Sequence, residues 1–231
     1  MPDPRVAGAL RWLEKHASKA VRDGMLRYAI PNDDALGVRM GDIQKLAKQL
    51  GRDHALALAL WKTGVYEARM LSAYVDEPAR VTAAQMDAQA RAFDNWAICD
   101  TLCFVLWVRT PHASSKIRRW ATHRGEFVKR ASFALLASVA LRDEQARDAD
   151  FLRGLKLVEK AAADERNFVK KGVNWALRGI GSRNLALNAA ALAVADRLAR
   201  SADPAPRWVG KDALRQLRSP ATRRRLAARA R

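Results

Sequence analysis

The sequence predicts an all-α fold, a solenoid of stacked antiparallel helix pairs. Strand signals are almost absent, because no long Val, Ile, Thr or aromatic stretch alternates with period two. Apolar residues at helical spacing fill the chain instead. The predicted second helices of the pairs recur at intervals of roughly 30–40 residues, which is a repeat period. We place their starts near Tyr66, Asn95, Glu126, Asn167 and Ala205.

Local signals justify these elements in order along the chain. A Gly, Pro and Asn-Asp-Asp cluster between residues 21 and 40 marks a loop, and GDIQKLAKQLGRD then predicts a short amphipathic helix that ends at Gly51. Each later second helix follows another apolar helical segment. Two-helix units of this length cannot bury their apolar faces alone, so they must stack around one continuous core and leave a concave face. No linker divides the chain, and we expect one domain over residues 1–231; an irregular helical bundle is the alternative.

The last predicted pair is strongly basic. Residues 205–231 contain a single acid, Asp212, and nine basic residues: Arg207, Lys211, Arg215, Arg218, Arg223, Arg224, Arg225, Arg229 and Arg231. Leu214, Leu217 and Leu226 keep near-helical spacing, which favours a closing basic helix pair over a solvated tail.

The charge of the whole chain indicates a polyanionic partner. The formal net charge is +18, with 42 Lys and Arg against 24 Asp and Glu, and the pI is about 10.8. This excess is beyond what solubility needs. No run approaches the roughly 20 apolar residues of a spanning helix, and the start MPDPRVAGAL lacks the apolar core of a signal peptide. We therefore expect a nucleic-acid partner, no membrane and a cytoplasmic protein.

Cysteine and histidine usage argues against metal or disulfide chemistry. Cys99 and Cys103 are four apart in one apolar segment, where a helix does not normally allow a disulfide, so we expect reduced packing residues. The four histidines are scattered and lack HExxH or Cys/His zinc spacing. We expect no metal and no cofactor.

The most informative pair is Trp96 and Asp100 in FDNWAICDTLCFVLW. Their i, i+4 spacing sets an indole and a carboxylate on one face of a helix. The residues around Asp100 are apolar, and a carboxylate there is costly to desolvate unless it has a partner or a function. The alternative from spacing alone is structural: Asp94 or Asn95 caps the helix, and Asp100 pairs with a nearby arginine.

A second candidate site lies in FVKKGVNWALRGIG. Lys171, Trp175 and Arg178 fall at i, i+4 and i+7, a cationic and aromatic stripe that suits a nucleic-acid backbone. The alternative is a core indole beside snorkelling cations. Lys129 and Arg130 enter another apolar helix, where a lone basic pair is usually solvated.

The other tryptophans carry weaker signals. Trp208, between Arg207 and Lys211, either touches DNA or anchors the last helix. We interpret the rest as core packing: Trp12, Trp61, Trp107 and Trp120.

Together these segments resemble the bacterial DNA alkylation repair family of AlkD-type alkylpurine DNA glycosylases, over about residues 5–231. The resemblance rests on the order and separation of GVRMGDIQKLAK (37–48), LWKTGVYEARMLSAYVD (60–76), FDNWAICD (93–100), EFVKRASFALL (126–136) and NFVKKGVNWALRGIG (167–181). It implies a solenoid of HEAT-like repeats whose concave face grips duplex DNA.

The resemblance also implies residue roles. The Trp-x-x-x-Asp of the family matches Trp96 and Asp100, its second lesion-facing tryptophan matches Trp175, and the arginine that follows matches Arg178. Arg130 is the match for the basic residue of the central helix. Asp100, Trp96 and Trp175 are then the expected catalytic residues, and the expected DNA-binding residues are Arg130, Lys171, Arg178, Lys129 and Lys211. The chain departs from the family pattern at Asn95 and Ala97, and this departure bears on substrate range.

The activity so implied is hydrolysis of the N-glycosidic bond of 7-alkylguanine and 3-alkyladenine in duplex DNA, by a monomer and without a base-flipping pocket. Two other classes stay open. One is a non-catalytic HEAT-like binder of damaged or branched DNA; loss of the aspartate would favour this class, but Asp100 is present. The other is a protein-binding scaffold, which leaves the net charge of +18 unexplained.

Overall fold

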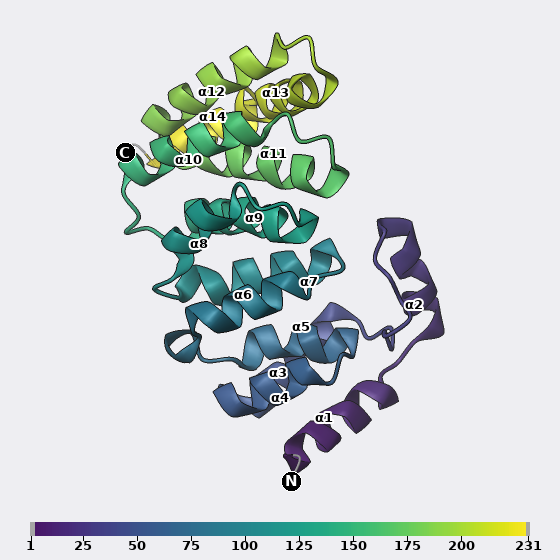
Figure 1. The fold of residues 1–231 in the computed structure, drawn as a ribbon. Coiled ribbons are helices and arrows are strands. Elements are labelled where there is room, and N and C mark those ends of the chain that lie inside the picture. The colour runs from purple at the N-terminus through teal and green to yellow at the C-terminus, as the bar shows by residue number, and fades with distance from the viewer. Residues whose placement is uncertain (1–2, 230–231) are drawn as a thin grey trace. The chain divides into compact units, whose positions relative to one another are not determined.

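The computed structural model describes residues 3–229, and among them every regular element is a helix. The prediction of an all-α fold is therefore confirmed (Figure 1). The chain divides into two compact units, Met1–His112 and Ala113–Arg231. The expectation of a single domain stays a prediction.

Unit 1 contains seven α-helices among its described residues, with short 3₁₀ turns and one π-helical turn (Figure 1). The α-helices are α1 (Pro4–Lys15), α2 (Lys19–Met25), α3 (Met40–Leu50), α4 (His54–Lys62), α5 (Tyr66–Val75), α6 (Ala83–Arg91) and α7 (Trp96–Thr101). The 3₁₀ turns are η1 (Leu26–Tyr28), η2 (Pro78–Arg80) and η4 (Trp107–Arg109), and the π-helical turn is η3 (Leu102–Leu106).

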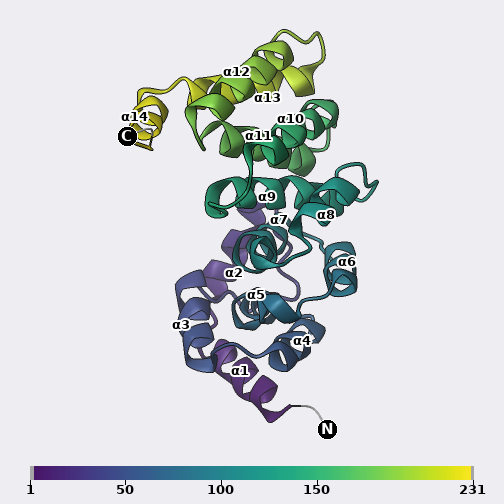
Figure 2. The same ribbon diagram turned by 90° about the vertical axis from the view of Figure 1, so that its left-hand side faces the viewer.

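In unit 2, α10 pairs with α11 and α12 pairs with α13 (Figure 2). The two pairs stack on each other through contacts of α11 with α12 and α13. Its described helices are α8 (Ala113–Trp120), α9 (Glu126–Arg142), α10 (Asp148–Ala161), α11 (Asn167–Gly181), α12 (Leu185–Ala199), α13 (Pro204–Leu217) and α14 (Pro220–Arg229).

The predicted helix starts agree with the structure. The second helices α5, α9 and α11 begin at Tyr66, Glu126 and Asn167, and α7 and α13 begin at Trp96 and Pro204, each within one residue of its predicted start. Helix α3 ends at Leu50 and is capped by Gly51, where it was predicted to end; the Gly51 φ of 72° is a positive value that favours glycine. The closing basic helix pair is confirmed through Arg229, while Arg231 lies outside the described residues.

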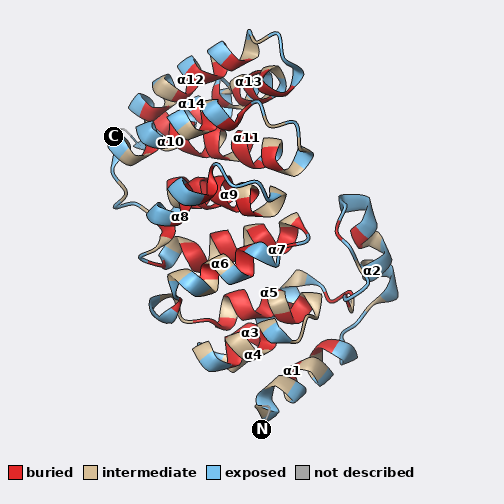
Figure 3. Cartoon of the chain, viewed as in Figure 1, coloured by how far each residue is buried: buried red, intermediate tan, exposed pale blue. Residues whose placement is uncertain are grey.

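Close backbone contacts join the helices of unit 2. A Cβ on Gly179 of α11 would lie 3.4 Å from the Ala137 Cα of α9, and a Cβ on Gly210 of α13 would lie 2.3 Å from the Ala199 N of α12. Glycine therefore allows these helices to approach closely. Figure 3 shows the resulting burial, with α9 and α11 mostly buried.

The tryptophans and cysteines predicted to pack inside do so only in part. Cys99 and Cys103 are not joined in a disulfide and are fully buried, as predicted. Trp107 and Trp120 are 0% and 2% exposed and belong to the core. The prediction was too simple for two others: Trp12 is half-buried and stacks on His16, and Trp61 is half-buried with an Arg69 guanidinium 5.1 Å from its ring centroid.

A buried carboxylate fixes the segment that precedes α3. Glu67 of α5 is 0% exposed and accepts hydrogen bonds from the backbone N–H groups of Leu36, Gly37 and Val38, at 2.9, 2.7 and 3.1 Å. Gly37 has a φ of 82°, and a Cβ there would lie 2.3 Å from the Ser18 carbonyl oxygen. Glu67 thereby holds residues 36–38 against α5, whereas α2 and η1 are largely exposed in Figure 3.

We expect Glu67→Gln to lower the free energy of unfolding by about 2 kcal/mol, because an amide cannot accept all three buried N–H groups and brings N–H donors of its own. Denaturant unfolding measures this change. Glu14→Gln on the exposed surface of α1 is the control, expected within about 0.5 kcal/mol of the parent protein. Equal stability of the two variants would contradict the anchoring role of Glu67.

Candidate functional site

The first turn of α7 is set by an asparagine cap. Asn95 is 1% exposed, and its Oδ1 accepts hydrogen bonds from the backbone N–H groups of Ala97 and Ile98, both at 3.0 Å. Its Nδ2 donates to Asp94 Oδ1 at 2.7 Å. The cap satisfies the otherwise unpaired N–H groups of this end and fixes the backbone that carries Trp96.

Trp96 and Asp100 lie one turn apart on α7, as their spacing predicted. Both are half-buried, whereas Ile98 and Cys99 between them point into the core at 2% and 0% exposed. The Trp96 indole Nε1 donates a hydrogen bond of 2.8 Å to the Tyr28 carbonyl oxygen of η1. A backbone carbonyl of η1 therefore orients the indole.

The helix changes geometry directly after this pair. Residues Leu102–Leu106 form a π-helical turn, which buries Leu102, Cys103 and Leu106. Turns of this kind are rare in proteins, and those that occur are frequently found at functional sites. No proline or glycine marks this turn in the sequence, so pattern reasoning did not predict it.

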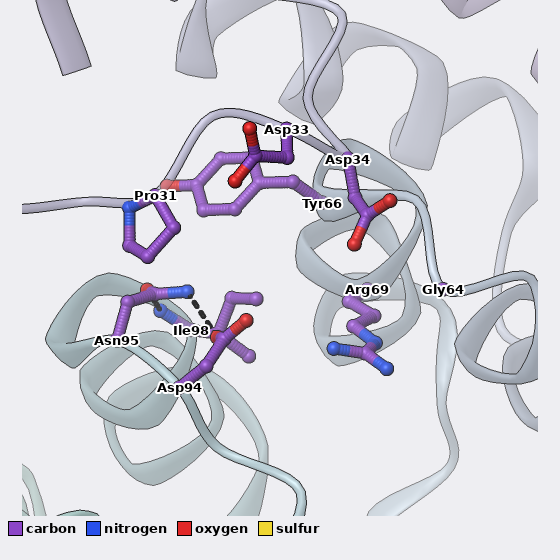
Figure 4. Close-up of a pocket in the computed structure, with 9 residues that line it drawn as sticks. All are labelled: Pro31, Asp33, Asp34, Gly64, Tyr66, Arg69, Asp94, Asn95 and Ile98. Atoms are coloured by element: carbon purple, nitrogen blue, oxygen red, sulfur yellow. Dashed lines mark hydrogen bonds between the residues drawn. The ribbon is translucent and has the colours of Figure 1, made fainter. Parts of the chain in front are cut away.

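A small polar pocket lies beside the start of α7 (Figure 4). Its volume is about 80 Å³, and it is lined by Pro31, Asp33, Asp34, Gly64, Tyr66, Arg69, Asp94, Asn95 and Ile98. Burial raises the pKa of the Tyr66 phenol well above its usual value, with Glu67 and Asp94 adding to the shift. The volume suits a few water molecules and is far below the roughly 300 Å³ at which ligand pockets begin, so this pocket does not accept a purine base.

In unit 2, the predicted stripe of α11 forms one face of the helix. Lys171 is exposed and has no hydrogen-bond or ion-pair partner among residues 3–229. Trp175 and Arg178 are half-buried. The Arg178 Nη1 donates to Gln216 Oε1 of α13 at 2.6 Å and lies 4.0 Å from Asp212 Oδ2, so its guanidinium already has partners within the protein.

Lys129 and Arg130 are not the solvated pair that their position indicated. Lys129 Nζ forms an ion pair of 2.9 Å with Asp164, which also pairs with Arg166 at 2.6 Å. Hydrogen bonds from Arg166 and then Lys129 hold the pKa of the Asp164 carboxyl far below its usual value. Arg130 is 6% exposed, and its Nη1 donates to the Phe168 carbonyl oxygen at 2.7 Å.

Helix α13 presents the remaining candidate residues. Lys211 is exposed and has no hydrogen-bond or ion-pair partner in the described part of the chain. Trp208, one turn earlier, is 40% exposed, and the Lys170 ammonium of α11 lies 5.3 Å from its ring centroid. Sequence reasoning missed Lys170, although its position next to Lys171 in a basic stripe was visible.

The structure thus groups the candidates by unit. Unit 1 brings Trp96 and Asp100 together, and unit 2 carries Lys129, Arg130, Lys171, Trp175, Arg178 and Lys211. Over residues 3–229, no group of three or more His, Cys, Asp or Glu side chains is placed to hold a metal ion. None of the described helices is both long and apolar enough to span a membrane.

A comparison with known protein families shows to which family the chain belongs. The family described as "DNA alkylation repair enzyme" matches residues 9–217, which is most of the chain. The chain belongs to the DNA alkylation repair enzyme family. Membership confirms the resemblance that the sequence segments carry.

A solved structure supports the family's fold in this chain. The match has a TM-score of 0.74 at 17% sequence identity and covers 91% of this chain and 95% of the other. That protein is described as one of "a new family of proteins related to the HEAT-like repeat DNA glycosylases with affinity for branched DNA structures". The likeness confirms the HEAT-like repeat fold. No curated protein matches the sequence.

The Asp164 ion pairs make a pH-dependent contribution to the free energy of unfolding of this chain. We expect Asp164→Asn to lower the free energy of unfolding at neutral pH, because it removes the carboxylate that Arg166 and Lys129 hold. The pKa of Asp164 is lower in the folded than in the unfolded protein. The difference in free energy of unfolding between the variant and the parent protein is therefore largest above the unfolded pKa of about 3.9. This difference shrinks as the pH falls from there toward the folded pKa.

Denaturant unfolding of both proteins between neutral and acid pH measures this difference. Asp150→Asn is the control, because its carboxylate is exposed and its ion pairs with Arg147 and Arg153 lie within one turn of α10. A stability difference for Asp164→Asn that grows on acidification has the wrong sign and contradicts the assignment.

Proposed function

We propose that this chain is a DNA N-glycosylase that releases cationic alkylated purines from duplex DNA. Trp96 and Asp100, an indole and a carboxylate on one face of α7, are the observation that carries the proposal. The family is that of a DNA alkylation repair enzyme, and the net charge of +18 suits a DNA ligand. The lesions we assign are 7-alkylguanine and 3-alkyladenine.

The proposed chemistry needs a carboxylate but no general acid. An N3- or N7-alkylated purine carries a positive charge and leaves as a neutral base once the glycosidic bond breaks. The deoxyribose then acquires oxocarbenium character, which a preplaced carboxylate stabilises electrostatically. Asp100 takes this role and orients or deprotonates the attacking water. Water adds to C1′ and loses a proton, which leaves an abasic sugar.

The two tryptophans contribute binding that favours the charged sugar. Indole faces attract cations and CH groups, so Trp96 and Trp175 stabilise the oxocarbenium more than the neutral ground state. The hydrogen bond from Trp96 Nε1 to the Tyr28 carbonyl oxygen supports this role, because it fixes the ring orientation before substrate binds. The lesion is handled without insertion into a deep protein pocket.

We assign the direct phosphate contacts to Lys171 and Lys211. Both are exposed, and neither has a partner among residues 3–229. Lys129, Arg130 and Arg178 already bond to Asp164, the Phe168 carbonyl and Gln216, so they add positive charge from fixed positions. The protein acts as a monomer on duplex DNA.

Replacement of the carboxylate tests the chemistry. We expect Asp100→Asn to abolish release of 7-methylguanine from methylated duplex DNA, because the amide keeps the shape but loses the charge that faces the sugar. DNA affinity should stay within a few-fold. Asp23→Asn, an exposed carboxylate on α2, is the control and should release base like the parent protein. Equal base release by Asp100→Asn removes this residue from the mechanism.

Replacement of an exposed lysine tests the DNA contact. We expect Lys171→Ala to weaken binding to all duplex sequences to a similar degree and to reduce the slope of log affinity against log salt by about one. Lys156→Ala on α10 is the control, because that lysine is also exposed. A loss of affinity confined to particular sequences contradicts a backbone contact.

A non-catalytic binder of branched or damaged DNA is the second candidate. The solved structure of similar fold favours it, because that relative is described by its affinity for branched DNA. Absence of base release from methylated duplex by the parent protein, together with tight salt-dependent binding, selects this candidate. Binding that is absent at low salt instead selects a protein-binding scaffold.

A further inference from the structure

Trp208 is an indole displayed to solvent by a rigid backbone. It is 40% exposed, while Trp107 and Trp120 are buried. The buried Asn174 side chain of α11 donates to the Val209 carbonyl oxygen at 3.2 Å, next to Trp208 in the chain. Gly210 packs on the α12 backbone. The exposure of this ring is therefore a fixed feature of α13. An exposed indole does not contribute the stabilising free energy that burial of its ring would give.

The surroundings of this indole are cationic. The Lys170 ammonium lies 5.3 Å from the ring centroid, and the exposed Lys211 follows one turn along α13. The acid nearest in sequence on this helix, Asp212, forms ion pairs with Arg178 and Arg215. The positive charge around Trp208 thus stays available for an anionic ligand.

We propose that Trp208, with Lys170 and Lys211, binds a nucleotide that is not base-paired. The base stacks on the indole, and the two ammonium groups contact the flanking phosphates. An unpaired nucleotide fits better than a duplex, because bases inside a duplex already stack on each other and offer no free face. A protein partner fits less well, because this surface combines one aromatic ring with unneutralised cations. The proposal rests on DNA as the ligand, but it assigns a site separate from Asp100.

The test compares two DNA ligands by fluorescence anisotropy: a blunt duplex, and the same duplex with a single-stranded overhang. We expect Trp208→Ala to weaken binding of the overhang ligand by about fivefold or more, and binding of the blunt duplex by less than about twofold. Trp208→Phe keeps an aromatic face and should retain most of the affinity. Lys170→Ala should lose affinity for the overhang ligand, and Lys170→Arg should restore it.

Leu152→Ala on α10 is the matched control, because it also removes a large exposed apolar side chain from unit 2, and it should bind both ligands like the parent protein. Thermal unfolding checks that each variant is folded; if Trp208→Ala is not, Trp208→Phe and the Lys170 pair decide. Equal losses on both ligands, or no loss on either, overturn the proposal. Unchanged DNA binding by all these variants indicates a protein partner for this surface.

The same data separate this inference from the proposed function. A parent protein that binds neither ligand at low salt contradicts DNA binding itself. A parent protein that binds blunt duplex with a steep salt dependence, yet is indifferent to the overhang and to Trp208, contradicts only the inference.

Discussion

The rest of the structure depends on one constraint: the second helix of each pair is buried on all sides but one. Helix α11 shows it most clearly, because nine of its fifteen residues are buried and its half-buried and exposed positions include Lys171, Trp175 and Arg178 at i, i+4 and i+7. A helix in this setting has one strip of surface left for chemistry. Trp96 and Asp100 occupy the corresponding strip of α7, and Trp208 and Lys211 that of α13. Stacking thus decides which side chains stay accessible on each helix.

The charged residues divide into two groups with different roles. Lys129 and Arg166 form ion pairs with Asp164 in the loop before α11, and Arg178 lies within ion-pair distance of Asp212 on α13. These pairs stabilise the arrangement of helices. Lys171 and Lys211 have no such partner among the described residues, and the arginines at 223–225 of α14 are also exposed. The net charge of +18 therefore overstates the number of cations available to DNA.

The fold followed from the sequence because helix periodicity and end signals are local. The second helices began within a residue of their predicted starts, and Gly51 and Asn95 acted as the terminal residues that their types indicate. The partners of charged side chains did not follow, because they depend on contacts across helices. Asp164 is 35 residues from Lys129, and the Tyr28 carbonyl is 68 residues from the Trp96 indole. The π-helical turn after Asp100 also lacked a local signal.

The central claim is that the Asp100 carboxylate faces a sugar that becomes positive as its base departs. The most direct measurement compares the affinity of the protein for two duplexes, one with a cationic pyrrolidine in place of the lesion deoxyribose and one with a neutral tetrahydrofuran. We predict that the parent protein binds the cationic sugar at least about tenfold more tightly, and that Asp100→Asn removes this preference. Equal affinity of the parent protein for the two sugars contradicts it.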